Sequence, residues 1–285
     1  MDKSMKNYHK SPLRYPGGKS RAIKFLKDFF PRACKEFREP FFGGGSVGLY
    51  LAQRGKNLSL FANDLNYDVY CFWNTLKTDS TNLIEHITRI KESTKNGREL
   101  YKQILARREQ KLSELERAVD FFILNRITFS GLLDCGGYSQ KAYESRFTQS
   151  SIERLKAMPQ ILQNFHFSCD DYEALLQKNG EDVFIFLDPP YFSATKSKLY
   201  GKKGDLHTGF CHKRLCENLK NTKHKFLLTY DDSDFIRELY GDFYVKEFSV
   251  QYGMNNFKQE KAAKGKELLI SNFSLIQLKH TLFSA

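Results

Sequence analysis

The sequence predicts an α/β protein in which a mostly helical insertion interrupts a doubly wound parallel sheet. Strand-like apolar segments alternate with helical segments towards both ends of the chain, which is typical of such sheets. Between about residues 76 and 165 the pattern changes to long polar helical segments, followed by a Gly- and Ser-rich stretch. We therefore expect a sheet domain made of residues 1–75 and 166–285, with an insertion at residues 76–165.

The first part of the sheet domain is predicted to alternate helices and strands around a glycine-rich turn. Arg21–Phe30 has an amphipathic helical pattern, and Pro31 ends it. The segments that follow are an apolar run at Arg38–Phe42, the turn Gly43–Ser46, a helix at Val47–Gln53, a strand at Leu58–Ala62 and the pair Asn63-Asp64. A strand, a glycine turn, a helix, a strand and an acid thus follow one another within about 25 residues, as in nucleoside-cofactor folds.

The insertion and the second part of the sheet domain differ in their periodicity. The insertion is predicted to hold helices at Thr81–Lys95, Glu99–Lys111 and Glu114–Ile127, and then the Gly- and Ser-rich stretch Ser130–Ser151. Strand patterns return after Gln163, at Phe165–Cys169, Val183–Leu187, Lys225–Thr229, Tyr244–Tyr252 and Glu267–Phe273.

The tetrapeptide Asp188-Pro189-Pro190-Tyr191 follows directly on the apolar run Val183–Leu187, which reads as a buried parallel strand. Neither proline can donate a ladder hydrogen bond, so the strand must end there. A carboxylate, a prolyl carbonyl and an aromatic ring then stand at the carboxyl end of a central strand, where open α/β sheets bind ligands. This group suits a planar amine held between acceptors and a ring face. The alternative is a strand-ending turn with a surface tyrosine.

The glycine turn and Asp64 together indicate a cofactor that contains a nucleoside. Gly43, Gly44 and Gly45 let the backbone approach a ligand closely, with a helix N-terminus behind them. Asp64, about 20 residues on, is placed to accept from ribose hydroxyl groups. The turn is not G-x-G-x-x-G, which counts against a nicotinamide dinucleotide, and the glycines alone also fit a plain tight turn.

Charge and cysteine usage limit the partners and the compartment. The 285 residues carry a formal net charge of +12, and residues 1–39 and 195–225 each contribute +7. Two basic blocks, one beside the tetrapeptide, favour a surface that tracks phosphates over an ordinary solvated face. No apolar run is long enough to span a membrane, and no secretory signal is visible. The six cysteines contain no C-x-x-C pair, so we expect a reduced cytoplasmic protein without a metal site.

Four segments carry a resemblance to a known family: Arg14-Tyr15-Pro16-Gly17-Gly18-Lys19, Pro40-Phe41-Phe42-Gly43-Gly44-Gly45-Ser46, Asn63-Asp64 and Asp188-Pro189-Pro190-Tyr191. Together, and in this order, they resemble the DNA adenine-N6 methyltransferases of the Dam family (the alpha group). The closing Lys266–Ile270 is similar to that family's last strand. The resemblance covers about residues 11–275 and implies a Rossmann-like, S-adenosyl-L-methionine-dependent, site-specific adenine methyltransferase that acts on double-stranded DNA.

The resemblance also implies which residues hold the cofactor. Tyr15 is expected to pack on or beside the adenine of S-adenosylmethionine, and Lys19 to contact the region of the methionine carboxylate. The other expected cofactor contacts are Phe42, Gly43 and Gly45 under the methionine moiety, Asp64 on the ribose, Asp171 beside the adenine, and Asp188. Asp170 suits the adenine position as well as Asp171 does, and the sequence leaves that choice open.

Catalysis is expected to lie in Asp188, Pro189, Pro190 and Tyr191. The N6 amine of adenine is a poor nucleophile because its lone pair is delocalised into the ring. Acceptors at Asp188 and the Pro189 carbonyl would bind the amino protons and stabilise the positive charge that develops during direct methyl transfer. Tyr191 would stack on the base, which must be flipped out of the duplex to reach this pocket.

DNA recognition is expected in the insertion. The expected DNA contacts are Arg126, Ser130 and Arg146 in the insertion and Lys202 and Lys203 in the second basic block. The two arginines can read guanine edges or bind phosphate, and each can equally be an ordinary surface arginine. The insertion departs from the GATC-specific members of the family, so the recognition sequence stays open. We expect a monomer in a restriction–modification or phage-related context, in the former with a restriction endonuclease that acts separately.

Two other classes of function remain in view. A related fold can methylate an RNA amine or a protein amine or amide, since Asp-Pro-Pro-Tyr resembles the Asn-Pro-Pro-Tyr of such enzymes. Asp188 and the segment Tyr15–Lys19 favour DNA adenine instead. A catalytically silent DNA-binding regulator would keep the basic surface, but the intact cofactor segments argue against it.

Overall fold

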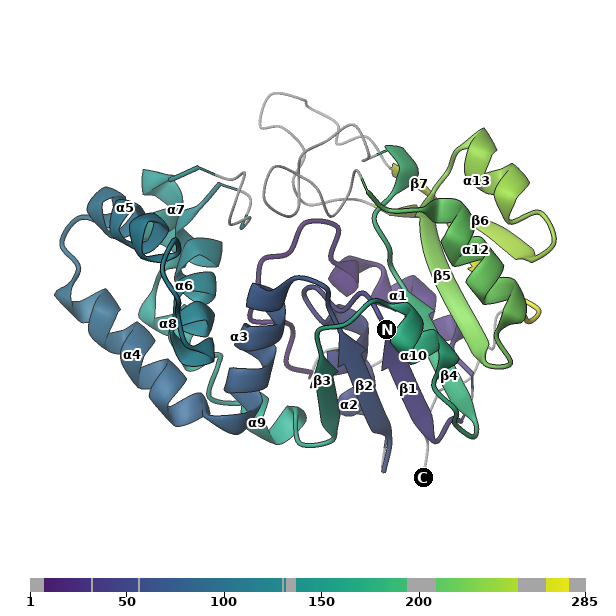
Figure 1. Ribbon diagram of the computed structural model, residues 1–285, viewed down its shortest axis with the longest axis horizontal. Helices are drawn as coiled ribbons and strands as arrows, with labels where there is room; N and C mark the ends of the chain where they lie inside the picture. The colour runs from purple at the N-terminus through teal and green to yellow at the C-terminus, as the bar shows by residue number, and fades with distance from the viewer. Residues whose placement is uncertain are drawn as a thin grey trace.

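The structure is a computed structural model that describes residues 8–31, 33–55, 57–129, 131, 137–193, 209–250 and 265–276. A seven-stranded sheet forms its centre, in the order β3-β2-β1-β4-β5-β7-β6 (Figure 1). The strands are β1 (Glu36–Glu39), β2 (Ser59–Asn63), β3 (Phe165–Ser168), β4 (Val183–Leu187), β5 (Lys225–Asp231), β6 (Tyr244–Val250) and β7 (Gly265–Ser271).

The strand pairing confirms the predicted doubly wound α/β sheet. Strands β3, β2, β1, β4 and β5 are parallel neighbours, and only β7 pairs antiparallel, with β5 on one side and β6 on the other. The chain order reverses between β1 and β4, which makes this the switch point where such sheets bind ligands. All five residues of β4 are buried, as predicted for Val183–Leu187.

Helices follow most strands and also build the region between β2 and β3. The helices beside the sheet are α1 (Ile23–Leu26), α2 (Ser46–Ala52), α3 (Tyr67–Thr78), α10 (Glu173–Gln177), α12 (His212–Asn221) and α13 (Asp234–Leu239). Between α3 and β3 lie α4 (Ser80–Ser93), α5 (Gly97–Arg107), α6 (Glu114–Ile127), α7 (Gln140–Arg146), α8 (Gln149–Glu153) and α9 (Met158–Ile161). None of the described helices is long and apolar enough to cross a membrane.

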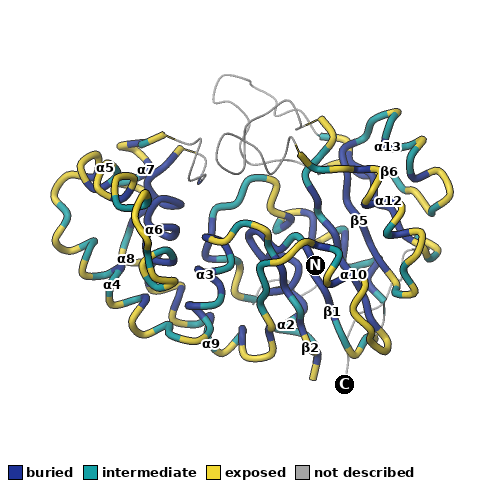
Figure 2. The backbone as a smooth tube through the Cα atoms, viewed as in Figure 1, coloured by how far each residue is buried: buried dark blue, intermediate teal, exposed yellow. Residues whose placement is uncertain are grey.

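The sheet separates two hydrophobic cores, and β4 contributes to both. Val183, Ile185 and Leu187 pack in the core shared with α10, α12 and α13, whereas Phe184 and Phe186 belong to the other core. This alternation follows from the two-residue period of a strand. Figure 2 shows the dark, buried sheet strands in the middle of the molecule with yellow, exposed backbone around its outside. Both cores lie beneath the carboxyl ends of the strands and hold those ends in place.

The helical region shares its core with the sheet. Buried residues of α6 and α8 belong to the same apolar cluster as α1, α2 and β1. Helix α3 connects the sheet to the helical region. It follows β2 directly and packs along α6, and the Trp73 ring of α3 contacts the Phe42 ring in an edge-to-face arrangement. The proposed boundary at residues 75/76 falls within α3, and the division into a sheet domain and an insertion at 76–165 stays a prediction.

The structure differs from the sequence prediction at Arg21–Phe30 and in the helices that the sequence analysis did not name, which are α3, α7, α8, α9, α10, α12 and α13. Arg21–Phe30 is not one amphipathic helix: 3-10 turns at Lys19–Arg21 and Lys27–Phe29 flank the single α-helical turn of α1. Ile23, Leu26 and Phe29 are buried at a spacing of three, the period of a 3-10 helix, so burying all three favours the tighter winding. Helix α3 has no counterpart in the prediction, although the Asn66 side chain caps it by accepting from the Asp68 and Val69 N–H groups.

Candidate methyl-transfer site

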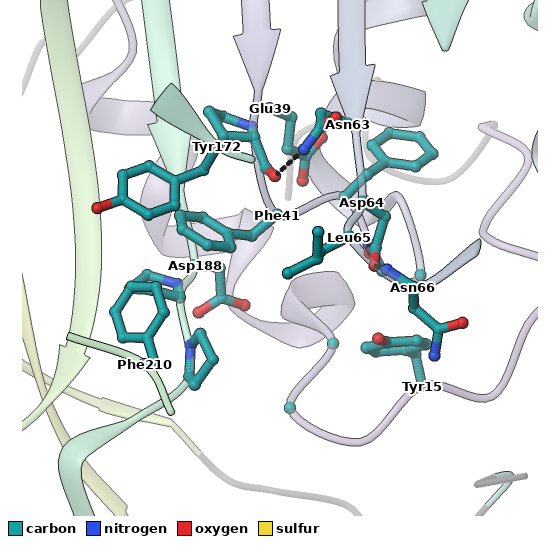
Figure 3. A pocket seen from close by; sticks show the side chains of 18 of the residues that line it. Tyr15, Glu39, Phe41, Asn63, Asp64, Leu65, Asn66, Tyr172, Asp188 and Phe210 are labelled. Atoms are coloured by element: carbon teal, nitrogen blue, oxygen red, sulfur yellow. Dashed lines mark hydrogen bonds between the residues drawn. The ribbon is translucent and has the colours of Figure 1, made fainter. Parts of the chain in front are cut away.

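A cavity of about 480 Å³ opens at the carboxyl ends of the parallel strands, at the switch point between β1 and β4. Four strand ends contribute to it: the glycine turn after β1, Asp64 after β2, Asp171 after β3 and the tetrapeptide Asp188–Tyr191 after β4. The N-terminal segment Tyr15–Lys19 closes one side (Figure 3). All the residues predicted for cofactor binding and catalysis therefore line one cavity.

The glycine turn needs glycine for two reasons. Gly43 and Gly45 have φ angles of +46° and +65°, which side chains rarely adopt. A Cβ atom on Gly43 would lie 2.6 Å from the Tyr15 ring, and one on Gly45 would lie 2.5 Å from the Phe42 ring. The two aromatic rings thus pack directly on the backbone of the turn, and this wall of the cavity is main chain rather than side chain.

Asp64 holds the glycine turn from the neighbouring strand. One carboxylate oxygen accepts from the Gly43 N–H at 2.7 Å and the other from the Asn66 N–H at 2.9 Å. Burial raises the pKa of Asp64 to about 6, against the lowering effect of these two hydrogen bonds. From the other side, the Trp73 indole N–H donates to the Gly43 carbonyl at 2.9 Å. The turn is therefore fixed at both its N–H and its C=O.

Asn63 ties the ends of three strands together and separates Asp170 from Asp171. Its buried amide donates to the Pro40 and Asp170 carbonyls and accepts from the Asp170 N–H and the Ser168 hydroxyl. The Asp170 backbone is thus engaged with β2, whereas Asp171 lines the cavity. Asp171 also pairs with Arg214, whose guanidinium lies 3.2 Å from its carboxylate. This placement favours Asp171 as the acid that faces the cavity.

Asp188 is held by a cation and a hydroxyl group. The Lys19 ammonium lies 2.7 Å from its carboxylate, and the Thr229 hydroxyl donates to it at 2.8 Å. Lys19 is only 3% exposed, donates also to the Gly17 carbonyl, and lies 5.0 Å from the centre of the Tyr191 ring. The ion pair holds the carboxylate in one orientation at the floor of the cavity. The sequence did not predict that Lys19 contacts Asp188.

A match between this sequence and a known protein family identifies the family of the chain. The sequence pattern of the D12 class N6 adenine-specific DNA methyltransferase family matches residues 15–254, which include every segment of the cavity wall described above. The chain belongs to this family. This confirms the resemblance drawn from the sequence, and it makes the protein an adenine-specific DNA methyltransferase.

Several relatives of this methyltransferase match over most of their own length. They include the Type II methyltransferase M.MjaIII of Methanocaldococcus jannaschii, which is 26% identical and covers 92% of this chain and 98% of its own length. The Type II methyltransferase M.CviBI of Paramecium bursaria Chlorella virus NC1A is 24% identical, with 90% and 95% covered. The DNA adenine methylase of Haemophilus influenzae is 25% identical, with 92% and 93% covered. These matches support neither the RNA or amide methyltransferase nor the silent regulator.

Two buried acids of the methyltransferase were not predicted as site residues. Glu39 at the end of β1 accepts from the Gly48 N–H at 2.8 Å, and burial raises its pKa well above the ordinary value. Glu267 of β7 is 1% exposed, and burial raises its pKa to about 7. Its carboxylate and the Tyr191 hydroxyl group influence each other's pKa without closing a hydrogen bond of ordinary geometry. Glu267 lies within the quoted segment Lys266–Ile270, but the sequence analysis assigned neither acid a role, because each reaches the site only through sheet pairing.

Aromatic side chains form the end of the cavity near Asp188. Phe41 lies 5.3 Å from Tyr172 and 5.7 Å from Phe210, measured between ring centres. Figure 3 shows these three rings gathered on the side of Asp188, with Tyr15, Asp64 and Asn66 opposite. Flat apolar faces of this kind suit a planar aromatic ligand. Phe41 stands within a quoted motif, but Phe210 carries no sequence signal of its own.

The predicted DNA contacts differ in their burial, and three of them are not described. Arg126 is 4% exposed and lies over the Phe122 ring at 5.2 Å, inside the helical region. Arg146, at the end of α7, is half-buried and donates to the Phe129 carbonyl. Ser130, Lys202 and Lys203 lie outside the described residues. Phe129, whose carbonyl accepts from Arg146, is 68% exposed and offers an aromatic surface there.

Proposed function

We propose that the cavity binds S-adenosyl-L-methionine and that Asp188 holds the N6 amine of a flipped-out adenine from double-stranded DNA. The observation that carries this proposal is the position of Asp188, fixed by Lys19 and Thr229 in the same cavity as the glycine turn. A nucleophile-binding acceptor and a nucleoside-binding turn thus share one space. Direct methyl transfer needs that proximity.

The residues of the turn wall fit this cofactor. Any side chain at Gly43 or Gly45 would meet a ring that already packs there, so the turn leaves room only for backbone beside a ligand. Asp64 keeps lone pairs beyond its two backbone hydrogen bonds with which to accept from ribose hydroxyl groups. The proposed cofactor contacts remain Tyr15, Lys19, Phe42, Gly43, Gly45, Asp64, Asp171 and Asp188.

Asp188 and its neighbours are proposed to prepare the amine. S-adenosylmethionine supplies an electrophilic methyl group on a sulfonium. The Asp188 carboxylate and the Pro189 carbonyl accept the N6 protons and stabilise the positive charge that develops on nitrogen. Lys19 holds the carboxylate in one orientation, rather than only contacting the cofactor. Tyr191 offers its ring face to the base, with Pro190 fixing the turn between them.

Binding of the duplex is proposed to involve residues 76–165 and the second basic block. Arg126, Ser130 and Arg146 remain the proposed contacts in the helical region, with Lys202 and Lys203 in the basic block. Because the target amine must reach the floor of the cavity, the adenine has to leave the stack. Relatives named Type II methyltransferases support a restriction–modification context, with a separately acting endonuclease, and a viral relative supports a phage-like one. A monomer in the cytoplasm agrees with either.

The proposal is tested by expression in a host that lacks adenine methylation. Sequencing the native DNA should reveal N6-methyladenine at one short recognition sequence, and an Asp188→Ala variant should leave that DNA unmodified. Calorimetry with S-adenosylmethionine, without DNA, checks the cofactor separately. Wild-type protein that binds the cofactor but marks no DNA, while labelling RNA or protein with tritiated methyl groups, would refute the DNA assignment.

A further inference from the structure

A second cavity, of about 470 Å³, adjoins the first. Tyr15, Gly18, Gly44 and Ser46 line both cavities, so the glycine turn forms a shared wall. The remaining lining comes from the N-terminal segment and from Arg146 at the end of α7. The second cavity therefore lies where the N-terminal segment, the glycine turn and the helical region meet.

Four arginines lie close together at this junction. Arg14 donates to the carbonyls of Thr128 and Phe129, Arg146 donates to Phe129, and Arg154 donates to Pro12. Within the described ranges no carboxylate pairs with any of these three or with Arg126. In the described part of the chain, Arg14, Arg146 and Arg154 thus meet backbone carbonyls rather than carboxylates.

Arg126 is the most buried of these four arginines. Two of its guanidinium nitrogens, Nε and Nη2, are buried and meet no acceptor in the described part of the chain. Burial, and then the charges of Arg154, Arg14 and Arg146, lower its pKa to about 9. Burial and Arg146 likewise lower the pKa of Arg14 to about 10. An anion bound beside Arg14 and Arg146 would offset part of this mutual repulsion.

We propose that the second cavity binds a phosphate group of the DNA backbone. Arg14, Arg21 and Arg146 line it together with the hydroxyl groups of Ser11, Ser20 and Ser46. Guanidinium forks match phosphate oxygens two at a time, and hydroxyl groups complete such sites as donors. The inference rests on the proposed DNA-methylating function, which supplies the polyanion. It adds a defined phosphate position one wall away from the cofactor.

The shared wall also couples the two cavities. A Cβ atom on Gly44 would lie 2.8 Å from the Tyr15 Cβ atom, so Tyr15 touches the turn that faces the cofactor. S-adenosylmethionine carries a net positive charge, which the neighbouring charges of Arg14 and Arg146 oppose. A phosphate in the second cavity removes that repulsion and tightens cofactor binding, and the cofactor must then tighten DNA binding by the same factor.

The test compares two double variants that lose equal charge. Arg21→Gln/Arg146→Gln changes the cavity, whereas the surface variant Lys178→Gln/Lys246→Gln changes cations after α10 and on β6, outside residues 76–165 and both basic blocks. Fluorescence anisotropy measures duplex affinity against salt concentration for both. The cavity variant should flatten the log–log salt slope by about 1 to 2, and the surface variant should flatten it much less. Circular dichroism melting confirms folding, and Arg146→Gln alone serves if the double variant melts early.

Trp73 reports on the coupling. It is the single tryptophan of the chain, and its indole N–H donates to the Gly43 carbonyl in the shared wall. Fluorescence titration with S-adenosylmethionine should give at least about fivefold tighter binding in the presence of duplex, the lower end of typical coupling. The cavity variant should lose this gain, and the surface variant should keep it.

Each other outcome overturns a defined part of the proposal. Equal flattening of the salt slope in both double variants would reduce the effect to general charge. Inorganic phosphate that perturbs Trp73 in wild type but not in the cavity variant, with equal salt slopes, would make the cavity a free-phosphate site instead. Wild-type protein that binds neither duplex nor cofactor would sink the proposed function itself. Normal DNA binding with no effect of Arg21 and Arg146 sinks only this inference.

Discussion

The two walls of the methyl-transfer cavity differ in the chemical groups that form them. The glycine wall, which consists of Gly43, Gly44, Gly45 and Asp64, presents main chain that one carboxylate and one indole fix in place. The acid wall presents Lys19, Asp188 and Tyr191 to the cavity, with Thr229 and Glu267 buried behind them, so that its charges and hydroxyl groups come from four separate segments. The first should therefore be sensitive to added volume and the second to altered charge.

The largest effect is expected on the acid wall. Asp188→Asn keeps the shape of the side chain but removes the charge that pairs with Lys19 and turns one acceptor into a donor. Methyl transfer from tritiated S-adenosylmethionine should fall by about 100- to 1,000-fold, the scale of losing one preorganised electrostatic contact. Cofactor affinity, measured by calorimetry, should change much less. Turnover within tenfold of wild type would contradict the assigned role.

A larger side chain in the glycine wall should weaken cofactor binding. Gly43→Ala places a methyl group 2.6 Å from the Tyr15 ring and keeps a left-handed backbone that costs alanine about 1 to 2 kcal/mol. S-adenosylmethionine affinity should fall by at least about tenfold. Gly137→Ala is the matched control, because Gly137 also has a positive φ, +51°, but nothing lies within 4 Å of its Cβ position. Equal losses of affinity in both variants would mean that backbone strain, rather than the clash, is responsible.

The same contrast explains how much the sequence could predict. The glycine wall is local: a turn, a helix and an acid within about 25 residues, so its pattern is visible along the chain. Asp188 and Tyr191 were equally visible, because two prolines must end the apolar strand before them. In the structure, every residue expected to bind the cofactor or to act in catalysis lines one cavity.

The rest of the acid wall is not local and could not be predicted in that way. Thr229 reaches Asp188 because β5 pairs beside β4, and Glu267 is buried because β7 inserts antiparallel between β5 and β6. Neither residue type is unusual in a strand, so no spacing rule marks them. The arginines of the second cavity meet only when residues 14 and 146 come together in the fold. Tertiary pairing, rather than propensity, decides these contacts.

Glu267 should make the acid wall a cost to stability at alkaline pH. Its pKa is raised to about 7 from an ordinary 4.5, so the folded protein binds this proton more tightly than the unfolded chain. The cost is therefore full above pH 7 and is relieved as the pH falls towards 4.5. Glu267→Gln should raise the free energy of unfolding by about 1 to 3 kcal/mol at pH 8 and by little at pH 5. Urea denaturation at both pH values measures this, and equal gains at the two would contradict it.

A pH-dependent effect on cofactor binding should come from the one charge of the glycine wall. The pKa of Asp64 is raised to about 6, so its carboxylate gains a proton as the pH falls through 6 and can no longer accept from both Gly43 and Asn66. Cofactor affinity in wild type should therefore decline below about pH 6. Asp64→Asn should lose about 1 to 3 kcal/mol of binding at pH 8, the scale of leaving a polar partner unsatisfied, and should show no decline of its own between pH 7 and 5. Calorimetric titration across that range measures both. If Asp64→Asn still shows the decline in cofactor affinity seen in wild type, another group causes that decline. The glycine wall would then bind the cofactor through its backbone alone.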